Sequence, residues 1–318
     1  MGAAMAETPV RGTPTRSGQA RASLARFRER ERDRGAVMPG TFRAAVAAEM
    51  GQAFSPPYQV PIVVAVNGLL MAGAWFLLPR GWLFTLQSAL AFPVVLSSWM
   101  YADVPATNVL APDRIRVLAA LGDGTMISRL LLAKTAVLWV FVAPLCAVQG
   151  LVVALDHHDP LLIGTEIIAI CVVPVACLPV VALVGIRWPY HPLQLRYRWD
   201  HRVPLRRMII RWLILLAVPY VLVPALCLLM TVPAVILLVL THSANNHVIS
   251  FVDAEGKPFG LALSGPSHPL SGGIFAACIA LTCGVAVVVW VLGRRADMWL
   301  IRRRQPAIAA YLADPAQG

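Results

Sequence analysis

The sequence predicts an all-α polytopic membrane protein with six transmembrane helices, an N-terminal interfacial helix and a re-entrant outer segment between spans five and six. Of the 318 residues, 58% are hydrophobic, only 14% are charged, and the formal net charge is +11. In soluble domains about a quarter of the residues are charged. The apolar residues also gather in runs of roughly twenty, the length that a helix needs to cross a hydrocarbon core about 30 Å thick.

The first 57 residues divide into a polar part and an amphipathic part. Residues 1–38 contain an Arg-rich stretch at 26–34 and few large apolar side chains, so we expect a basic cytoplasmic tail that is disordered or forms a solvated helix. In the second part, 39–57, an apolar side chain recurs at every fourth position, at Phe42, Val46, Met50 and Phe54. This spacing predicts an amphipathic helix that lies on the membrane surface before the first span.

Six apolar segments define a transmembrane domain at 58–293. They cover residues 59–78, 82–101, 129–155, 161–186, 208–241 and 273–293. The fifth is too long for one crossing, because its thirty-odd residues would extend roughly 50 Å at the α-helical rise. We therefore expect one crossing at 208–228, followed after Pro233 by a half-membrane or surface segment that stays on the outer side and leads into an outer loop at 242–272.

The distribution of Lys and Arg predicts the orientation. Cytoplasmic loops carry the positive excess. Basic residues gather at the amino end, at 114–134, at 187–211 and at 294–304, whereas Arg80 and Lys257 fall on the other side. Both termini are then cytoplasmic, the number of crossings is even, and 294–318 forms a basic cytoplasmic tail. High usage of Ala, Val, Arg and Pro is typical of proteins from GC-rich bacterial genomes. We therefore expect the protein to lie in a plasma membrane, the bacterial inner membrane.

The stretch 101–128, between the second and third spans, is the most informative part of the chain. Pro112 suits a first helical turn, and Gly122 is a natural stop. The apolar residues between them share one helical face with Leu110: Val117, Leu118 and Leu121. Asp123 or Thr125 can cap the next helix, which enters the membrane at Arg129. The pattern predicts a short amphipathic helix, a break, and a second helix that runs into the bilayer.

This loop resembles the permease subunits of ABC exporters of the six-span type. The resemblance in sequence is confined to residues 113–134, where a helix with Arg and a Leu-rich face precedes a turn and then Arg-Leu-Leu-Leu-Ala-Lys from Arg129. In that family a surface helix precedes the first span, and a re-entrant outer element between spans five and six is typical. Members often have a Glu near the start of the loop helix, and Ser-Pro where this chain has Gly-Asp-Gly-Thr at 122–125.

The resemblance implies a membrane-spanning subunit coupled through the 101–128 loop to a separate ATP-binding cassette ATPase. The implied coupling residues are Asp113, Arg114, Arg116, Leu118, Leu121, Asp123 and Arg129. It also implies a second permease half, either another copy or a paralogue. The chain contains no G-x-x-x-x-G-K-[ST] phosphate-binding loop, so ATP hydrolysis would fall to the partner. We expect no catalytic residues and no cofactor in this chain.

Polar residues in or near the apolar runs offer weaker candidates. The turn from Asp156 to Asp159 contains two histidines, and His242 and His247 can lie on the same side, but adjacent histidines point in different directions. We interpret this turn as a plain polar turn and expect no metal. Glu166 lies within the fourth apolar run, where a carboxylate is a functional candidate because its burial is costly. An interfacial position close to Asp159 is the alternative that we favour.

The remaining unusual residues have structural interpretations. Six cysteines lie inside apolar runs, where a free thiol packs as a small hydrophobe: Cys146, Cys171, Cys177, Cys227, Cys278 and Cys283. Lys134, near the inner edge of the third span, can extend to the headgroups. The basic stretches at 187–207 and 302–304 adjoin apolar runs, so we expect them to contact anionic lipids rather than nucleic acid.

Two other functions are compatible with the same sequence. One is a non-catalytic scaffold or assembly protein of the cell envelope that binds another membrane complex through the 101–128 loop. The other is a membrane-embedded lipid or glycan transferase, which would hold a divalent cation between paired carboxylates at a membrane face. Asp103 and Asp113 are the acidic pair that could serve on the inner side. The lack of a denser acidic motif makes the enzyme the weaker alternative.

Overall fold

The structure, a computed structural model, confirms that the described part of the chain is helical. It describes residues 39–55, 58–77, 98–101, 104–154, 167–168, 171–191, 206–243, 249–250, 262–263 and 272–314. These residues form helices and turns apart from one antiparallel pair of two-residue strands, β1 (Ile249–Ser250) and β2 (Ala262–Leu263). The tail predicted at 1–38 lies outside the described residues.

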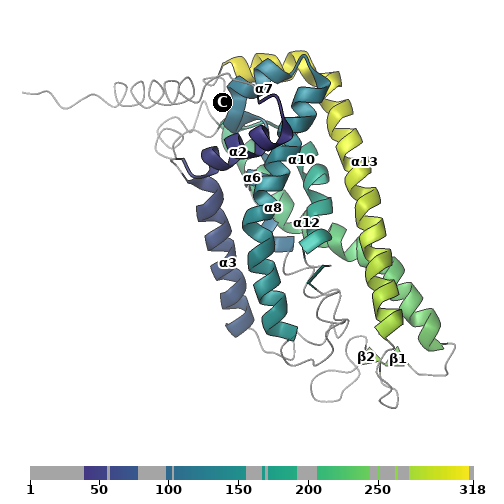
Figure 1. The fold of residues 1–318 in the computed structure, drawn as a ribbon. Coiled ribbons are helices and arrows are strands. Elements are labelled where there is room, and N and C mark those ends of the chain that lie inside the picture. The colour runs from purple at the N-terminus through teal and green to yellow at the C-terminus, as the bar shows by residue number, and fades with distance from the viewer. Residues whose placement is uncertain are drawn as a thin grey trace, which may run out of the picture.

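The helices form an elongated bundle (Figure 1). In chain order they are α2 (Phe42–Ala53), α3 (Gln59–Leu77), α6 (Val104–Thr107), the 3-10 turn η1 (Ala111–Asp113), α7 (Arg114–Ala120), α8 (Gly124–Ala154), the 3-10 turn η2 (Pro174–Cys177), α10 (Leu178–Arg187), α12 (Arg206–Ser243) and α13 (Gly272–Ala313). Helices α2 and α7 lie at one end, which we call the α7 end, and the strand pair lies at the other, the β end (Figure 1).

Three described helices are long and apolar enough to cross a membrane. They contain the segments Gly124–Val148, Ile209–Leu237 and Ala276–Ala313, which correspond to the predicted third, fifth and sixth spans. Two shorter apolar helical stretches, Val60–Leu70 and Pro174–Arg187, fall within the predicted first and fourth spans. The predicted second span lies outside the described residues except for 98–101. The composition and these helices together define a membrane protein.

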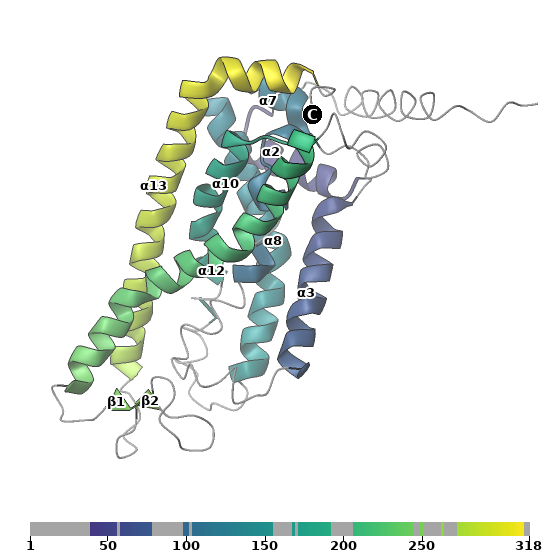
Figure 2. The same cartoon turned by 180° about the vertical axis from the view of Figure 1, so that it is seen from behind.

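The region after Pro233 differs from the sequence prediction. Helix α12 continues through Pro219, Pro224 and Pro233 and ends only at Ser243, so a separate half-membrane segment does not begin at Pro233. Proline inside a helix removes a backbone hydrogen bond and bends the axis without necessarily ending the helix. Figure 2 shows the result, an oblique helix that runs from the α7 end to the β end.

The C-terminal region, predicted as a basic tail from residue 294, is helical over most of its length. Helix α13 continues without interruption to Ala313, 42 residues in all, and its last turns bend over the α7 end (Figure 2). Ile301, Ile308 and Leu312 are buried there, in a hydrophobic cluster with residues of α7 and α8. Burial of this apolar face explains why the helix continues beyond the basic run that begins at Arg294.

A second hydrophobic cluster fills the middle of the bundle. It joins side chains of α8, η2, α10, α12 and α13 and includes Cys146, Cys177, Cys227 and Cys278. All six cysteines are free thiols, as their interpretation as packing residues requires. The apolar surface facing outward, including Val221 at 73% exposure, suits a lipid surrounding.

Two glycines let the backbone of α10 lie unusually close to its neighbours. A Cβ at Gly185 would lie 1.7 Å from the carbonyl oxygen of Thr107, and a Cβ at Gly293 of α13 would lie 2.9 Å from the Cβ of Pro179. No larger side chain fits at Gly185 without a backbone shift. The segment after α6 is thereby held against α10, and the Asn108 side chain donates to the Tyr190 carbonyl at 2.7 Å.

Candidate functional site

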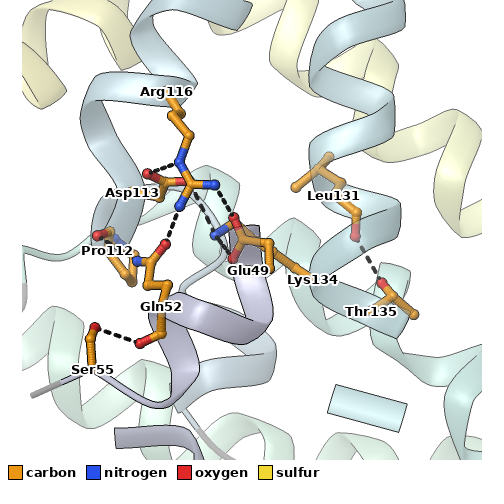
Figure 3. A network of polar contacts seen from close by, with 9 residues as sticks. All are labelled: Glu49, Gln52, Ser55, Pro112, Asp113, Arg116, Leu131, Lys134 and Thr135. Carbon is orange, nitrogen blue, oxygen red and sulfur yellow. Dashed lines mark hydrogen bonds and ion pairs between the residues drawn. The ribbon is translucent and has the colours of Figure 1, made fainter. Parts of the chain in front are cut away.

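A buried cluster of four charged side chains joins four elements at the α7 end (Figure 3). Glu49 comes from α2, Asp113 from η1, Arg116 from α7 and Lys134 from α8. We call these four residues the ionic junction. The Arg116 side chain lies 2.9 Å from Asp113 Oδ1 (from Nε) and 3.3 Å from Glu49 Oε1 (from Nη1). Lys134 Nζ lies 2.9 Å from Glu49 Oε2 and 3.7 Å from Asp113 Oδ2.

Helix α2 brings Glu49 to this position through a stripe of small residues. Thr41 starts the helix, because its hydroxyl accepts from the Ala44 amide at 3.2 Å. Ala45, Glu49 and Ala53 then recur at i, i+4 spacing and are all buried. The alanines leave room for α2 to lie close to α8, and the carboxylate between them reaches Lys134.

The apolar stripe predicted from the sequence, Phe42, Val46, Met50 and Phe54, lies beside the buried face of α2 rather than on it. Phe42 is 47% exposed and Phe54 is 58% exposed, whereas the buried stripe is the neighbouring one. Phe54 also contacts Phe141 of α8, with ring centroids 5.3 Å apart. The helix therefore packs on the bundle through small residues, while Phe42 is largely exposed and Phe54 contacts α8 from beyond the end of the helix.

Gln52 adds a neutral link to the ionic junction. Its side-chain oxygen accepts from Arg116 Nη2, and its amide nitrogen donates to the Pro112 carbonyl at 3.3 Å. A second position of α2 therefore contacts η1 and α7, one turn away from Glu49. Glu49 and Gln52 belong to one rigid helix. Their contacts therefore fix the angle of η1 and α7 to α2 as well as the distance between them.

The two carboxylates of the ionic junction have opposite pKa shifts. Burial disfavours both anions. At Glu49 the charges of Lys134 and Arg116 outweigh burial, and the pKa lies below its usual value. At Asp113 burial dominates, the neighbouring Glu49 adds repulsion, and Lys134 and Arg116 compensate only in part, so the pKa rises to about 6. A proton taken up by this pair of carboxylates is therefore held more readily by Asp113 than by Glu49.

The predicted helix, break and second helix in the 101–128 loop are confirmed. Helix α7 ends at Ala120, residues 121–123 form the break, and α8 begins at Gly124. Asp123 is the cap, because its Oδ1 accepts from the Thr125 amide at 2.7 Å and the Met126 amide at 3.3 Å. Bonds from Thr125 and Met126 hold the pKa of Asp123 below its usual value.

The structure places the predicted coupling residues mostly inside the chain. Asp113, Arg116 and Leu121 are buried, and Leu118 packs against the cluster at the α7 end. The remaining two predicted residues, Arg114 and Arg129, make long-range backbone contacts. Arg114 donates to the carbonyls of Leu312 and Ala313 at 3.2 and 3.3 Å, and Arg129 donates to that of Gly40 at 2.7 Å. Among the residues of this region whose burial the structure describes, Ala119, Gly122 and Thr125 are exposed.

Sequence reasoning did not find Glu49, and it gave Lys134 a different role. Lys134 does not extend to the headgroups, because both carboxylates of the ionic junction lie within 4 Å of its ammonium group and leave it only 13% exposed. The signal for Glu49 was available in the sequence, as a single acid between Ala45 and Ala53 on one helical face. A solvated acid on an amphipathic helix gives the same pattern, so the sequence alone did not separate the two.

A second buried carboxylate, Asp297 of α13, was also missed. Its residue exposure is 0%, and neither of its oxygens accepts a hydrogen bond from the described residues. The nearest charge is Arg294, with 3.8 Å between Nη1 and Asp297 Oδ2. Arg294 is held in place by Ser128 of α8, whose carbonyl and hydroxyl oxygens accept from its Nη2 at 2.9 and 3.1 Å. Asp297 and Lys134 both line a small cavity of about 20 Å³.

Most of the weaker candidates lie outside the described residues, including Asp103, the turn from Asp156 to Asp159, Glu166 and His247. His242 lies in the last turn of α12. Within the part of the chain that the structure describes, no group of three or more His, Cys, Asp or Glu side chains could hold a metal ion. The carboxylates that the described residues bring together, Glu49 and Asp113, are neutralised by two basic side chains.

Comparisons of this chain with protein-family models, curated proteins and solved structures give no match.

Proposed function

We propose that this chain is the membrane-spanning, permease-like subunit of an ABC exporter, coupled through the 101–128 loop to a separate ATPase subunit. In this proposal the protein has six spans and lies in a bacterial inner membrane, with both termini cytoplasmic. The α7 end is its cytoplasmic side. A second permease half, either another copy or a paralogue, completes the transporter.

The observation that carries the proposal is the ionic junction. A coupling loop must pass a push from outside the membrane to a spanning helix without bending in between. Here Glu49 and Lys134 tie α2 to α8, and Arg116 ties α7 to both α2 and η1. Four elements therefore move as one body in this proposal, and α8 itself contains a segment long enough to span the membrane.

The clustering of arginines at the α7 end supports the cytoplasmic assignment of that end. Arg114 bonds to the end of α13, Arg304 bonds to the Ile186 carbonyl at the end of α10, and Arg211 lies over the Tyr311 ring. Positively charged residues concentrate on the cytoplasmic side of membrane proteins.

The exposed tip of the 101–128 loop is the surface available to an ATPase. The buried coupling residues then act as positioning residues behind that tip, because their side chains are already occupied within the chain. Ala119 and Gly122 are exposed, and a Cβ at Gly122 would meet nothing within 4 Å. These two positions accept a new side chain without disturbing the fold, so they can test the contact separately from stability.

The experiment is a mild-detergent affinity purification of the full chain, with mass spectrometry of co-purifying proteins and an ATPase assay. We expect an ATPase with the wild-type chain, and its loss from the double variant Ala119→Glu and Gly122→Glu at an unchanged melting temperature. Gly51→Glu, at an exposed α2 position with equal space, is the matched control and should retain the ATPase. Recovery of an envelope enzyme or scaffold complex without an ATPase would refute the exporter proposal in favour of the two alternatives.

A further inference from the structure

A basic groove lies between the start of α8 and the C-terminal half of α13. Its volume is about 450 Å³, and it is lined by Ser128, Arg294, Arg295, Met298, Trp299 and Arg302. Ligand sites have volumes of about 300–1,000 Å³, so the groove is large enough for a phospholipid headgroup. Three of the six lining residues are arginines and none is acidic, so the ligand that complements it is an anion.

Two of the three arginines make no polar contact with the described part of the chain. Arg294 is bound to Ser128 and faces Asp297. Arg295 and Arg302 are exposed and have no hydrogen-bond or ion-pair partner among the described residues. The Arg302 guanidinium extends across to α8, where its Nη2 would lie 3.3 Å from a Cβ on Gly124. The groove thus presents charges that α13 positions and that nothing in the described chain neutralises.

The depth of the groove matches the headgroup layer of a bilayer. The apolar part of α13 runs from Gly272 to Gly293, about 33 Å at the helical rise, which is close to the thickness of a hydrocarbon core. Arg294 follows immediately, so the groove begins where the hydrocarbon ends. Trp299, 58% exposed, lies at the same level, and Trp is enriched at membrane interfaces.

We propose that this groove binds the headgroup phosphate of an anionic phospholipid. Arg295 and Arg302 donate to the phosphate oxygens, because guanidinium groups match phosphate geometry and form charge-assisted bonds. Trp299 lies against the boundary between headgroup and acyl chain. Since the groove is formed by two helices, a bound lipid bridges α8 and α13 and stabilises the folded chain by mass action. This site does not depend on the proposed exporter function.

The test uses the purified full chain in neutral detergent, titrated with phosphatidylglycerol or with phosphatidylcholine. Native mass spectrometry counts bound lipid, and a thermal shift assay measures stabilisation. We expect phosphatidylglycerol to bind and raise the melting temperature, and phosphatidylcholine to do so far less. The double variant Arg295→Gln and Arg302→Gln should bind phosphatidylglycerol about tenfold more weakly or worse.

Three controls keep the proposal falsifiable. Arg206→Gln with Arg207→Gln removes two exposed arginines from the start of α12 and should leave binding unchanged. Arg295→Lys with Arg302→Lys retains the charge and should bind between wild type and the Gln variant, which separates binding from misfolding. Equal losses in the α12 control would overturn the proposal in favour of diffuse surface attraction. Equal stabilisation by inorganic phosphate without lipid would overturn it in favour of a free-anion site.

Discussion

The two buried carboxylate sites at the α7 end are compensated in different ways. In the ionic junction two acids face two bases, and its ion pairs join α2, η1, α7 and α8. Asp297 faces a single arginine at 3.8 Å, and that arginine is three residues away on the same helix. The first arrangement connects elements that are distant in sequence. The second connects one turn of α13 with the next.

This difference implies that the charges of the ionic junction stabilise the fold, whereas Asp297 does not. Removing one member of a buried ion cluster leaves a partner charge without compensation, at a cost far above the net value of the pair. Removing an acid that has little compensation relieves a desolvation penalty. We therefore expect substitutions at the two sites to differ in size and even in sign.

Glu49→Gln should have the largest effect. The variant leaves Arg116 and Lys134 buried with only Asp113 as a counter-charge, so we expect a loss of about 3–5 kcal/mol in the free energy of unfolding. Thermal or denaturant unfolding of the full chain in detergent measures it. Asp123→Asn is the control at a helix cap outside the ionic junction, where Asn serves nearly as well. Similar small losses in both variants would contradict the structural role of the ionic junction.

Lys134→Met should destabilise less, by about 1–3 kcal/mol, because Arg116 still contacts both carboxylates. The double variant with Glu49→Gln should lose less than the sum of the two single losses, because the 2.9 Å contact is already absent in either one. A double-mutant cycle on the same unfolding assay gives this coupling. Strict additivity would show that the two side chains do not interact.

Asp113→Asn should change how the free energy of unfolding depends on pH. At low pH, where Asp113 is protonated, we expect a smaller change in stability. In the folded chain the pKa of Asp113 is raised from 3.8 to about 6, so the folded state holds its proton more tightly than the unfolded state. Wild-type stability therefore falls as pH rises through this window. The stability of the variant relative to wild type should increase from pH 3.8 to about 6 and then level off, as unfolding curves at several pH values would reveal. A flat difference would refute the shifted pKa.

Asp297→Asn should have the smallest effect, a change of less than about 1 kcal/mol or a slight gain. The substitution replaces a buried acid that accepts no hydrogen bond from the described residues, and Arg294 retains its bonds to Ser128. The measurement is the same unfolding assay, run beside Glu49→Gln. A loss as large as that of Glu49→Gln would show that the comparison between the two sites is wrong.

The local features of the α7 end could be predicted from sequence, and its long-range contacts could not. The helix at 39–57, the break near Gly122 and the Asp123 cap follow from spacing and capping preferences within a few residues. The contact between Glu49 and Lys134 joins positions 85 residues apart, and that between Gln52 and Arg116 joins positions 64 apart. A short-range sequence pattern does not predict which distant basic side chain a given acidic side chain contacts.

The boundaries of the long helices show a similar limit. The prolines of α12 and the arginines of α13 both indicate an end when they are considered alone. In the structure α12 continues past Pro233, and α13 continues past Arg294 because Ile301, Ile308 and Leu312 have an apolar surface to cover. Tertiary packing overrides the local signal, and the partner surface lies in α7 and α8, far away in the sequence.

The packing of α13 over α7 sets an order on biosynthesis. Arg114 and the Leu312 carbonyl to which it donates are 198 residues apart, and the apolar face of α7 is buried against the last turns of α13. On the ribosome, α7 is therefore made long before its cover exists. Until the C-terminal turns of α13 are made, they cannot cover the apolar face of α7. A chain that stalls late in synthesis therefore leaves this apolar face more exposed than the finished chain does.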